Sequence, residues 1–452
     1  MIALLCTVLG GAMSYLAFGL DNVWWLAWFA PVPILWLAYG EARGWMVFVA
    51  AFFSTAMGMI YFYQAYGAML LFDGVVLLVC NGLAAALTML LARVAWRRLS
   101  SMATLLVFPT LWTAFEFMEG WVSPHGGWGA WGYTQVAWPA AIQLAAITGV
   151  YGITFLVCLF ANGLAMVARG RMRAGGLGLA ICAAIIAAGY FRLQQPEGPT
   201  TRVAALAEVS RDYTKAFRTG DPIAASNVTQ SYVTAIRSLS AQNVHVFVTP
   251  ETGVEWNAIT PIAEAARDTH SLVIAGAHER APARDMAVAF VPGGRMVTYD
   301  KRHRLLPGES IYKPGTRSGV IGSGIGMAIC KDLDFPRTIR SDAQAGLRLM
   351  IVPAGDFTKD GWMHARQAIM RGVENGFSVL RAAFNGLETI SDAQGRVLAS
   401  AQVDHFGFTT IQADVPLGPG ATPYARYGDV FSWLAVLGAL GLITATLRAR
   451  RP

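Results

Sequence analysis

Long apolar segments separated by short polar connections fill the first 200 residues of the chain. Seven such segments occur there and an eighth lies near the C-terminus, at about 2–20, 23–39, 45–63, 74–92, 102–118, 139–167, 174–191 and 429–447. Each approaches or exceeds the roughly 18–20 residues that a helix needs to cross the hydrocarbon core of a bilayer. The pattern predicts a polytopic α-helical membrane protein with eight spans.

Between the seventh and eighth segments the pattern changes to short β-branched or apolar runs that end in Gly, Pro or polar residues. These runs predict buried strands at 202–208, 244–249, 272–277, 286–291, 325–330 and 348–353, with helices between them at 222–241, 260–269 and 361–376. Strands that alternate with helices indicate an α/β domain, whose reactive residues gather at strand ends. We therefore expect a seven-helix transmembrane domain over 1–198, an α/β domain over 199–428, and a last helix with a basic tail over 429–452.

Composition and charge narrow the class of protein. Hydrophobic residues make up 55% of the 452 residues and charged residues 14%, with a mean hydropathy of +0.44, which excludes an ordinary water-soluble enzyme. The net charge of +7 is spread along the chain. No basic surface for nucleic acid is expected, because such a surface concentrates its charge on one face or element.

Arginine clusters follow the fourth, sixth and eighth predicted spans, and Arg43 follows the second. The clusters are Arg93, Arg97 and Arg98; Arg169, Arg171 and Arg173; and Arg448, Arg450 and Arg451. With eight spans all of them fall on one side, which the positive-inside rule assigns to the cytoplasm. The opposite connections carry Asp21-Asn22, Asp73 and the Trp/Gly-rich stretch 119–138. Both termini are then cytoplasmic and the 199–428 domain faces outward; a cleaved signal peptide is the alternative for residues 1–20, but no basic segment precedes that apolar run.

Three predicted strand ends carry residues that can do chemistry. Glu251 ends Thr249-Pro250-Glu251, Lys301 follows Tyr299-Asp300 after a Pro-Gly-Gly turn, and Cys330 ends the run 326–330. Taken singly, each has a structural explanation: a charge at a helix N-terminus, a solvated loop residue and a buried core thiol. Together they form a set suited to acyl transfer through a thioester, because a carboxylate can take the proton of the thiol. An ammonium from Lys301 and the backbone N–H of Lys331 would stabilise the oxyanion.

The other cysteines and the histidines change this picture little. Cys6, Cys80, Cys158 and Cys182 lie in predicted spans, so Cys330 has no partner for a disulfide within the polar domain. The seven histidines and five cysteines show no ligand spacing for zinc or iron, and we expect no metal and no cofactor. His303 is expected to orient other groups, and the Gly-rich run 322–326 is expected to be a turn.

Several motifs give the chain a family resemblance. Pro250-Glu251, Lys301-Arg302-His303, Pro307-Gly308-Glu309 and Ile329-Cys330 resemble the Glu–Lys–Cys framework of the nitrilase, or carbon-nitrogen hydrolase, superfamily. Further motifs resemble the membrane-embedded branch of this superfamily, the apolipoprotein N-acyltransferases. In the polar domain they are His364, Met370-Arg371, Glu374, Arg381 and Asn385-Gly386. In the membrane part they are Glu116, Gly120-Trp121, Trp128 and Gly132-Tyr133-Thr134-Gln135. The resemblance covers almost the whole chain.

This resemblance implies a fold, a reaction and a set of site residues. The fold is a nitrilase-like αββα sandwich between seven helices and a last one, in the bacterial cytoplasmic membrane. The reaction moves an acyl chain from a phospholipid, typically phosphatidylethanolamine, to the cysteine thiol and then to the N-terminal amine of a diacylglyceryl-cysteine lipoprotein. Implied as catalytic are Glu251, Lys301 and Cys330; as supporting Glu309, Lys331, Asp332, His364 and Glu374; and as substrate-binding Trp128, Tyr133, Trp362 and Asn385.

Two other functions stay open at the level of sequence. A membrane-anchored amidase of the nitrilase type would use water as the acceptor, and Asp332 and the short segment 310–329 favour it. A catalytically silent membrane scaffold or transporter is disfavoured, because all three reactive residues are present and the spans lack the multiple charges of an ion-coupled pathway. Trp121, Trp128, Trp131 and Trp138 suit interfacial anchors or a grip on lipid, and Arg371 and Glu374 suit a structural pair one helical turn apart.

Overall fold

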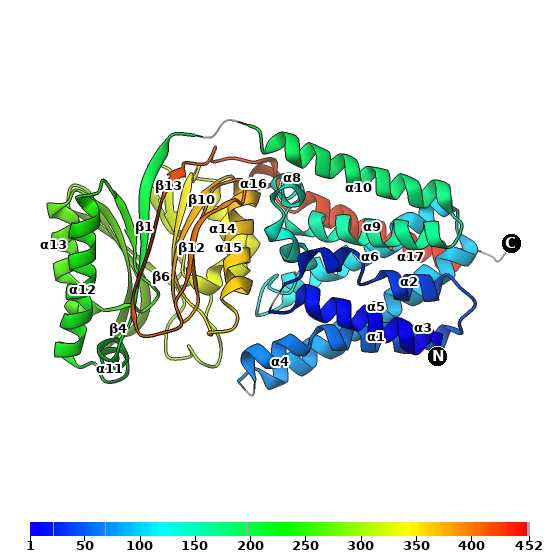
Figure 1. Cartoon of the computed structure of the whole chain (residues 1–452), viewed down its shortest axis with the longest axis horizontal. Coiled ribbons are helices and arrows are strands. Elements are labelled where there is room, and N and C mark those ends of the chain that lie inside the picture. Colours follow the sequence, from blue (N-terminus) through cyan, green and yellow to red (C-terminus); the bar gives the residue numbers. More distant parts are fainter. Residues whose placement is uncertain (21, 68, 196–197, 450–452) are drawn as a thin grey trace. The chain divides into compact units, whose positions relative to one another are not determined.

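The computed structural model describes residues 1–449 except 21, 68 and 196–197, and the chain divides into two compact units (Figure 1). The helical unit contains residues up to 195 and from 427 onward, and the α/β unit contains the segment between them. Asp21, Arg450 and Arg451, which entered the topology prediction, lie outside the described residues.

Apolar helices build the helical unit. Six segments among the described residues are long and apolar enough to cross a membrane: Gly44–Tyr66, which comprises α3 (Gly44–Gly58) and α4 (Ile60–Tyr66), then α5 (Leu71–Arg98), α6 (Ser101–Val122), α9 (Val150–Ala168), α10 (Met172–Arg192) and α17 (Val430–Arg448). The shorter pieces are α1 (Ile2–Phe18), η1 (Trp24–Trp28), α2 (Val32–Ala38), η2 (Trp131–Ala137), α7 (Pro139–Ile142) and α8 (Ala145–Thr148).

Two of the predicted spans are interrupted. The segment 23–39 forms a short 3-10 helix followed by α2, which begins after Pro31. Proline has no N–H and its ring clashes with the preceding turn, so one continuous helix cannot form there. The segment 139–167 breaks into α7, α8 and α9, and Gly149 adopts a φ of +70° immediately before α9. Hydropathy alone does not reveal either interruption.

Small residues allow close packing of α1 against α3. A Cβ on Gly10 would lie 2.7 Å from Ser54 Oγ, and a Cβ on Gly58 would lie 2.7 Å from Ser14 Cβ. Where lipid surrounds the helices, such close approach replaces the hydrophobic driving force of a soluble core.

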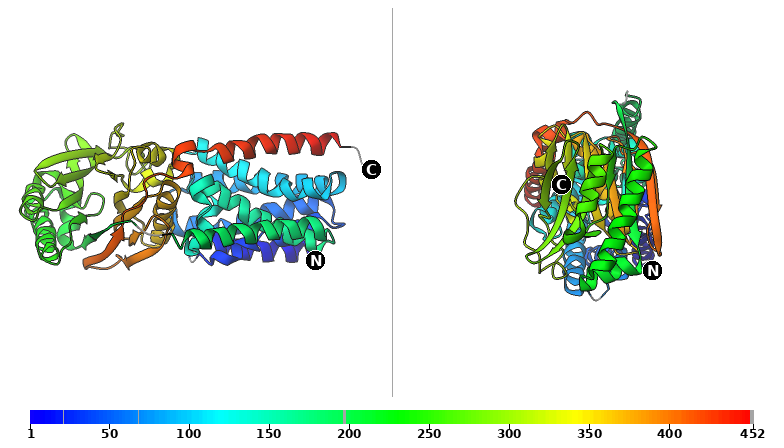
Figure 2. Two further views of the ribbon diagram at one scale, coloured as in Figure 1. Left: turned by 90° about the horizontal axis from the view of Figure 1, so that it is seen from above. Right: turned by 90° about the vertical axis from the view of Figure 1, so that its left-hand side faces the viewer.

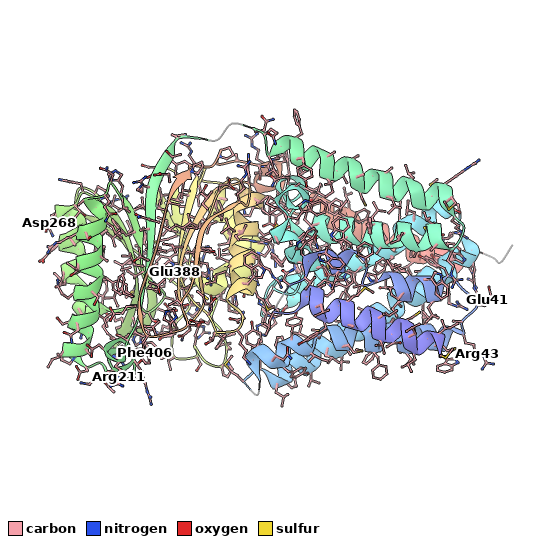
Figure 3. The ribbon with its side chains drawn as sticks, in the orientation of Figure 1. Glu41, Arg43, Arg211, Asp268, Glu388 and Phe406 are labelled. Carbon is pink, nitrogen blue, oxygen red and sulfur yellow. The ribbon has the colours of Figure 1, made fainter. Side chains whose placement is uncertain are left out.

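Of the arginines that were predicted to share one side, those within the described residues gather at one end of the helical unit. Arg93 donates to the carbonyls of Ala38 (2.8 Å) and Gly40 (2.9 Å), and Arg97 lies 3.8 Å from Glu41. Arg98 donates to the carbonyl of Thr446 at the end of α17 (3.4 Å). The first residues of α1, the last residues of α17 and the loop that carries Glu41 lie at this end as well (Figures 1 and 3).

Two β-sheets form the centre of the α/β unit. The first has the order β13-β1-β2-β4-β5-β6, with β3 paired to β4, and the second has the order β12-β11-β10-β9-β8-β7. The strands of the first sheet are β1 (Thr200–Val209), β2 (Val246–Val248), β3 (Val254–Glu255), β4 (Leu272–Arg280), β5 (Ala283–Val291), β6 (Arg295–Asp300) and β13 (Gly407–Pro416). Those of the second are β7 (Val320–Gly322), β8 (Ile325–Met327), β9 (Leu349–Gly355), β10 (Ser378–Phe384), β11 (Leu387–Ser391) and β12 (Val397–Gln402).

Helices cover the outer faces of the two sheets. Those of this unit are α11 (Arg211–Thr219), α12 (Pro222–Ser240), η3 (Trp256–Ala258), α13 (Thr260–Asp268), η4 (Cys330–Asp334), α14 (Pro336–Ala343) and α15 (Gly361–Asn375), and α16 (Pro423–Tyr427) follows the last strand. Side by side, α12 and α13 pack on the first sheet, while α14 and α15 lie over the second (Figures 1 and 2). Apolar side chains of both sheets fill the space between them. The result is the predicted αββα sandwich.

Strand ends in this sandwich position the reactive residues. The parallel strands β1, β2 and β4, and likewise β8, β9 and β10, direct their carboxyl ends to one edge of each sheet. The predicted strand 325–330 is shorter than expected, because β8 ends at Met327. Cys330 instead begins the 3-10 helix η4.

Candidate active site

Two adjacent carbonyls at the end of β9 anchor Glu251 and Cys330. The backbone N–H of Glu251 donates to the carbonyl of Ala354 (3.2 Å), and Cys330 Sγ donates to that of Gly355 (3.2 Å). Gly276 lets the Glu251 turn lie directly on β4, since a Cβ there would stand 1.9 Å from the carbonyl oxygen of Pro250. The predicted base and nucleophile are therefore fixed to one strand end.

Three carboxyl groups surround the ammonium of Lys301, which is 2% exposed. Lys301 Nζ donates to Glu251 Oε1 and to Glu309 Oε1 (2.7 Å), and it lies 3.6 Å from Asp285 Oδ2. One oxygen from each of the three acids lies within 4.8 Å of the others, a spacing that would also suit a metal ion. The ammonium already contacts all three acids and supplies the positive charge that a buried carboxylate cluster needs.

Burial and charge set the protonation of this cluster. Burial raises the pKa of the Cys330 thiol well above its usual value and the charge of Glu251 adds to the effect, although Lys301 opposes it. Burial opposes the charge of Lys301, but Glu251 and Asp285 outweigh it and hold the pKa of the lysine well above its usual value. Burial and the charge of Glu251 raise the pKa of Asp285. The resting site therefore has a protonated thiol, which needs a base before it can attack.

The backbone at Cys330 is held in an uncommon conformation. Its φ is +37°, a region that L-residues rarely adopt and that is frequent at functional sites. The fully buried carboxylate of Asp332 fixes this turn, accepting from the N–H of Ile329 (3.0 Å), the hydroxyl of Tyr299 (2.6 Å) and the N–H of His303 (2.9 Å). Burial opposes ionisation, but the hydrogen bonds from His303 and Tyr299 hold the pKa of Asp332 below its usual value. Asp332 thus ties the Lys301 loop to the Cys330 turn.

Lys331 and His303 contact neighbours on the same loop. Lys331 Nζ lies 3.4 Å from Asp334 Oδ2, and Lys331 is 7% exposed. His303 stacks on Phe335 with ring centroids 3.7 Å apart, and its Nδ1 lies 2.9 Å from Asp332 Oδ1. These contacts hold the side chains of Lys331 and His303 in place beside the turn that contains Cys330.

A second polar group follows β9 and β10. Arg381, which is buried, pairs with Asp356, and Asp356 also accepts from the N–H of Leu387 (3.3 Å) in the turn that contains Asn385. His364 Nε2 lies 3.0 Å from Asp360 Oδ2. Burial alone would lower the pKa of His364, but the charge of Asp360 outweighs burial and raises it to about 9.

The remaining predicted site residues lie on α15 and in the helical unit. Arg371 and Glu374 form the expected pair on α15, fully buried and 2.9 Å apart. Trp362 lies in the first turn of the same helix and is partly exposed. Trp128 and Tyr133 are buried in the helical unit. The substrate-binding roles of these aromatic residues stay predictions.

Sequence reasoning missed Asp285 and Asp356. Asp356 directly follows a buried strand, the same signal that singled out Glu251, so the pattern could have revealed it. Asp285 lies inside β5 beside apolar residues, and only the pairing of β5 with β4 and β6 brings it to Lys301. A lone acid within a strand has no local pattern that marks it as part of a site.

Comparison with known proteins finds matches for both parts of the chain. Residues 10–163 match the apolipoprotein N-acyltransferase N-terminal domain, and residues 229–421 match the carbon-nitrogen hydrolase domain. An apolipoprotein N-acyltransferase of Geobacter metallireducens is 28% identical over 99% of this chain and 95% of its own length, and one of Vibrio vulnificus is 24% identical over 98% and 96%. Among solved structures, an amidase from Nesterenkonia sp. aligns at 19% identity and a TM-score of 0.42, covering 49% of this chain and 93% of its own.

The fold and these matches first define a class: a carbon-nitrogen hydrolase domain joined to apolar helices of membrane-spanning length. Within that class, the chain belongs to the apolipoprotein N-acyltransferase family of the nitrilase superfamily, and it is an acyltransferase. The alternatives of an amidase and of a silent scaffold are not favoured, because the relatives that match almost the whole chain are named as acyltransferases.

Proposed function

We propose that this protein transfers an acyl chain from a membrane phospholipid, through a thioester on Cys330, to the N-terminal amine of a diacylglyceryl-cysteine lipoprotein. The observation that carries this proposal is the anchoring of Glu251 and Cys330 on adjacent carbonyls of β9, beside an ammonium that Glu251, Asp285 and Glu309 surround. Such an arrangement provides a nucleophile, a base and a positive charge in a buried site.

The first half of the reaction loads the cysteine. Glu251 takes the thiol proton of Cys330 as the sulfur attacks the ester carbonyl of the phospholipid. Positive charge from Lys301 stabilises the oxyanion of the tetrahedral intermediate. The carbon–oxygen ester bond then breaks and Glu251 returns the proton to the leaving oxygen, so that a lysophospholipid departs and an acyl thioester remains.

The second half delivers the chain to an amine. Glu251 takes a proton from the incoming neutral amine as its nitrogen attacks the thioester carbonyl, and the carbon–sulfur bond breaks to form an amide. The proton held by Glu251 returns to the sulfur, which restores the resting thiol. The phospholipid and the lipoprotein amine are consumed, and the lysophospholipid and the acylated lipoprotein are formed.

The other site residues position these groups in our proposal. Glu309 and Asp285 hold the Lys301 ammonium in place. Asp332 fixes the strained turn of Cys330. Lys331 contributes its backbone N–H to the oxyanion, and Glu374, His364 and Asn385 shape the neighbouring polar region. Trp128, Tyr133 and Trp362 contact the lipid substrates.

We also propose a membrane topology with eight spans. Helix α1 and the broken η1–α2 segment join the six longer helices, because they pack beside α9 and α3 within the same unit. The 17 residues of α1 make about 25 Å of helix, slightly less than the ~30 Å hydrocarbon core. The arginine-rich end faces the cytoplasm with both termini, and the domain over 199–428 faces outward. The donor is phosphatidylethanolamine of the bacterial cytoplasmic membrane.

One experiment tests the reaction. The purified full chain is incubated with phosphatidylethanolamine, freed of lipid, and then given a diacylated lipopeptide or buffer alone, and the acyl chain is followed by mass spectrometry. We expect the chain to move to the α-amine of the lipopeptide and to remain on the protein in buffer. Equally rapid release of free fatty acid in buffer would contradict the transferase, and an unmodified protein at every stage would contradict the thioester.

A further inference from the structure

A cavity lies within the helical unit among α1, α3, α5, α6 and the loop that follows α6. It is partly enclosed and partly open to solvent. Aromatic rings form one wall, where Trp131 stacks on Phe18 at 4.6 Å and lies 4.8 Å from Trp112 between ring centroids. All residues that line this space belong to the helical unit.

Two side chains present hydrogen-bond acceptors to this cavity. Asn81 Nδ2 donates to Glu119 Oε1 (2.7 Å) and to the carbonyl of Leu77 (3.0 Å), which uses both of its protons. This leaves Asn81 Oδ1 and Glu119 Oε2 as acceptors to which no described group donates. Among the described residues, the lining of the cavity therefore offers one carboxylate oxygen and one amide oxygen that accept no hydrogen bond.

The basic side chains around the cavity are few: its lining contains His125, whose Nε2 lies 3.6 Å from Asp73 Oδ1. No lysine or arginine occurs among the residues that line it, all of which the structure describes. The other acid in the lining, Glu116, already accepts from Trp112 Nε1 (2.9 Å), Thr154 Oγ1 (2.7 Å) and the N–H of Trp131 (3.1 Å). Glu119 thus differs from Glu116, because one oxygen of this lining residue accepts from no described group. An acid in a helix of membrane-spanning length, with no ion pair to a described lysine or arginine, indicates a functional role.

We propose that this cavity binds a lipid that carries a primary ammonium group, with the ammonium held by Glu119 and Asn81 and the apolar part against the aromatic wall. A primary ammonium has three N–H donors and a positive charge, which match the two open acceptors and the carboxylate. Aromatic faces add attraction for a cation. A quaternary ammonium has no N–H to donate, and a glycerol head group has no charge.

Two lipids in the proposed reaction carry this chemistry: the ethanolamine head group of the phospholipid donor and the α-amine of the diacylated acceptor. The inference rests on the proposed function only in the choice of these lipids. It is tested by binding and not by turnover, on a chain with Cys330→Ala, so that failure of the cavity and failure of the catalytic proposal give different results.

Native mass spectrometry of this full chain in detergent gives apparent dissociation constants for each lipid. The first arm compares phosphatidylethanolamine with phosphatidylcholine and phosphatidylglycerol of the same acyl chains. The second compares a diacylated lipopeptide that has a free α-amine with its N-acetylated form. In at least one arm, the form with the primary ammonium is expected to bind about tenfold more tightly.

Glu119→Gln is the decisive variant, because it keeps the bond from Asn81 and replaces the open oxygen with a donor. In Glu119→Gln we expect the dissociation constants of the lipids with and without a primary ammonium to agree within twofold. The arm in which the wild-type preference is lost shows whether the cavity binds the ethanolamine head group or the α-amine of the lipopeptide. Glu41→Gln, which removes the same charge from an exposed side chain of the unit, should retain the preference. Asn81→Leu provides a second variant in case Glu119→Gln unfolds. Preferences that are absent, or unchanged in both cavity variants, would overturn the proposal.

Discussion

Two groups of buried carboxyls, one in each unit, are stabilised in opposite ways. In the α/β unit, Glu251, Asp285 and Glu309 surround one buried ammonium. In the helical unit, neutral donors from Trp112, Thr154 and Trp131 satisfy both oxygens of Glu116, and no cationic side chain of the described residues forms an ion pair with it.

This difference in hydrogen-bond and ion-pair partners determines whether each carboxyl group can act in proton transfer. Neutral donors fix the position of Glu116 and leave it no role that requires a full charge. The ammonium of Lys301 lets three acids share a small volume, and the charge of the cluster can shift as protons move. We therefore expect acids that surround a buried cation at sites where protons are exchanged. We expect acids that accept only from neutral donors where the contact between two helices must be fixed.

The largest effect is expected from removal of the nucleophile. Cys330→Ala should abolish acyl transfer completely, because no other group in the cluster can form the thioester, and membrane insertion and melting temperature should stay near the wild type. Cys80→Ala, which alters an exposed cysteine of α5, is the matched control and should retain full activity. Transfer to a lipopeptide measures both, and residual turnover in Cys330→Ala would assign the chemistry elsewhere.

Removing the cation should damage the α/β unit in two ways. Lys301→Met leaves three acids without their positive charge, so we expect transfer to fall by roughly a thousandfold and stability to fall by about 3–5 kcal/mol. Thermal melting and the transfer assay measure these effects, with the exposed Lys313→Met as the control. A stable, active Lys301→Met variant would show that the acids do not depend on the ammonium.

His364 should make stability depend on pH in the alkaline range. Because Asp360 raises its pKa to about 9, the histidine binds its proton more tightly in the folded chain than in the unfolded chain, where the pKa is near 6.5. The contribution of His364 to the free energy of unfolding is complete below about pH 6.5 and is lost as the pH rises through 9. This contribution is at most about 3 kcal/mol. The melting temperature of the wild type should fall over this range. His364→Asn should flatten the curve, whereas the exposed His405→Asn should not.

The smallest effect should come from the acid held by neutral donors. In Glu116→Gln the amide oxygen can still accept from Trp112 and Trp131, and the amide nitrogen can donate to Thr154. We expect a loss of about 1 kcal/mol in stability and little change in transfer. A loss as severe as that of Lys301→Met would remove the distinction between the two groups of carboxyls.

Local sequence patterns predicted some residues of the candidate site, and the pairing of strands distant in sequence determined the others. Glu251 and Lys301 each follow a strand, so the end of an apolar run marked them. Asp285 joins them only because β5 pairs antiparallel with β4, where its partner is His278, and because the backbone N–H of Lys301 after β6 donates to its carbonyl. Glu388 is a further case, since this acid lies between the two sheets, fully buried (Figure 3), and burial raises its pKa well above the usual value. The sequence pattern predicts apolar residues between the two sheets, so it does not predict a buried acid at Glu388.

The helical unit shows the same limit. Hydropathy found each apolar segment, because composition and length decide whether a segment can enter a bilayer. It did not find the breaks at Pro31 and Gly149, which depend on local backbone chemistry. It also gave no indication that Glu119 keeps an oxygen open to a cavity, because that follows from how α5 and α6 pack.

The most direct test of the catalytic account is the mass of the peptide that contains Cys330, after the wild type and Glu251→Gln have been incubated with phosphatidylethanolamine. Glutamine can keep the bond from Lys301 but cannot take the thiol proton. We predict one acyl chain on Cys330 in the wild type and none in Glu251→Gln on the same time scale. Acylation at an equal rate in both proteins, or on a residue other than Cys330, would contradict the account.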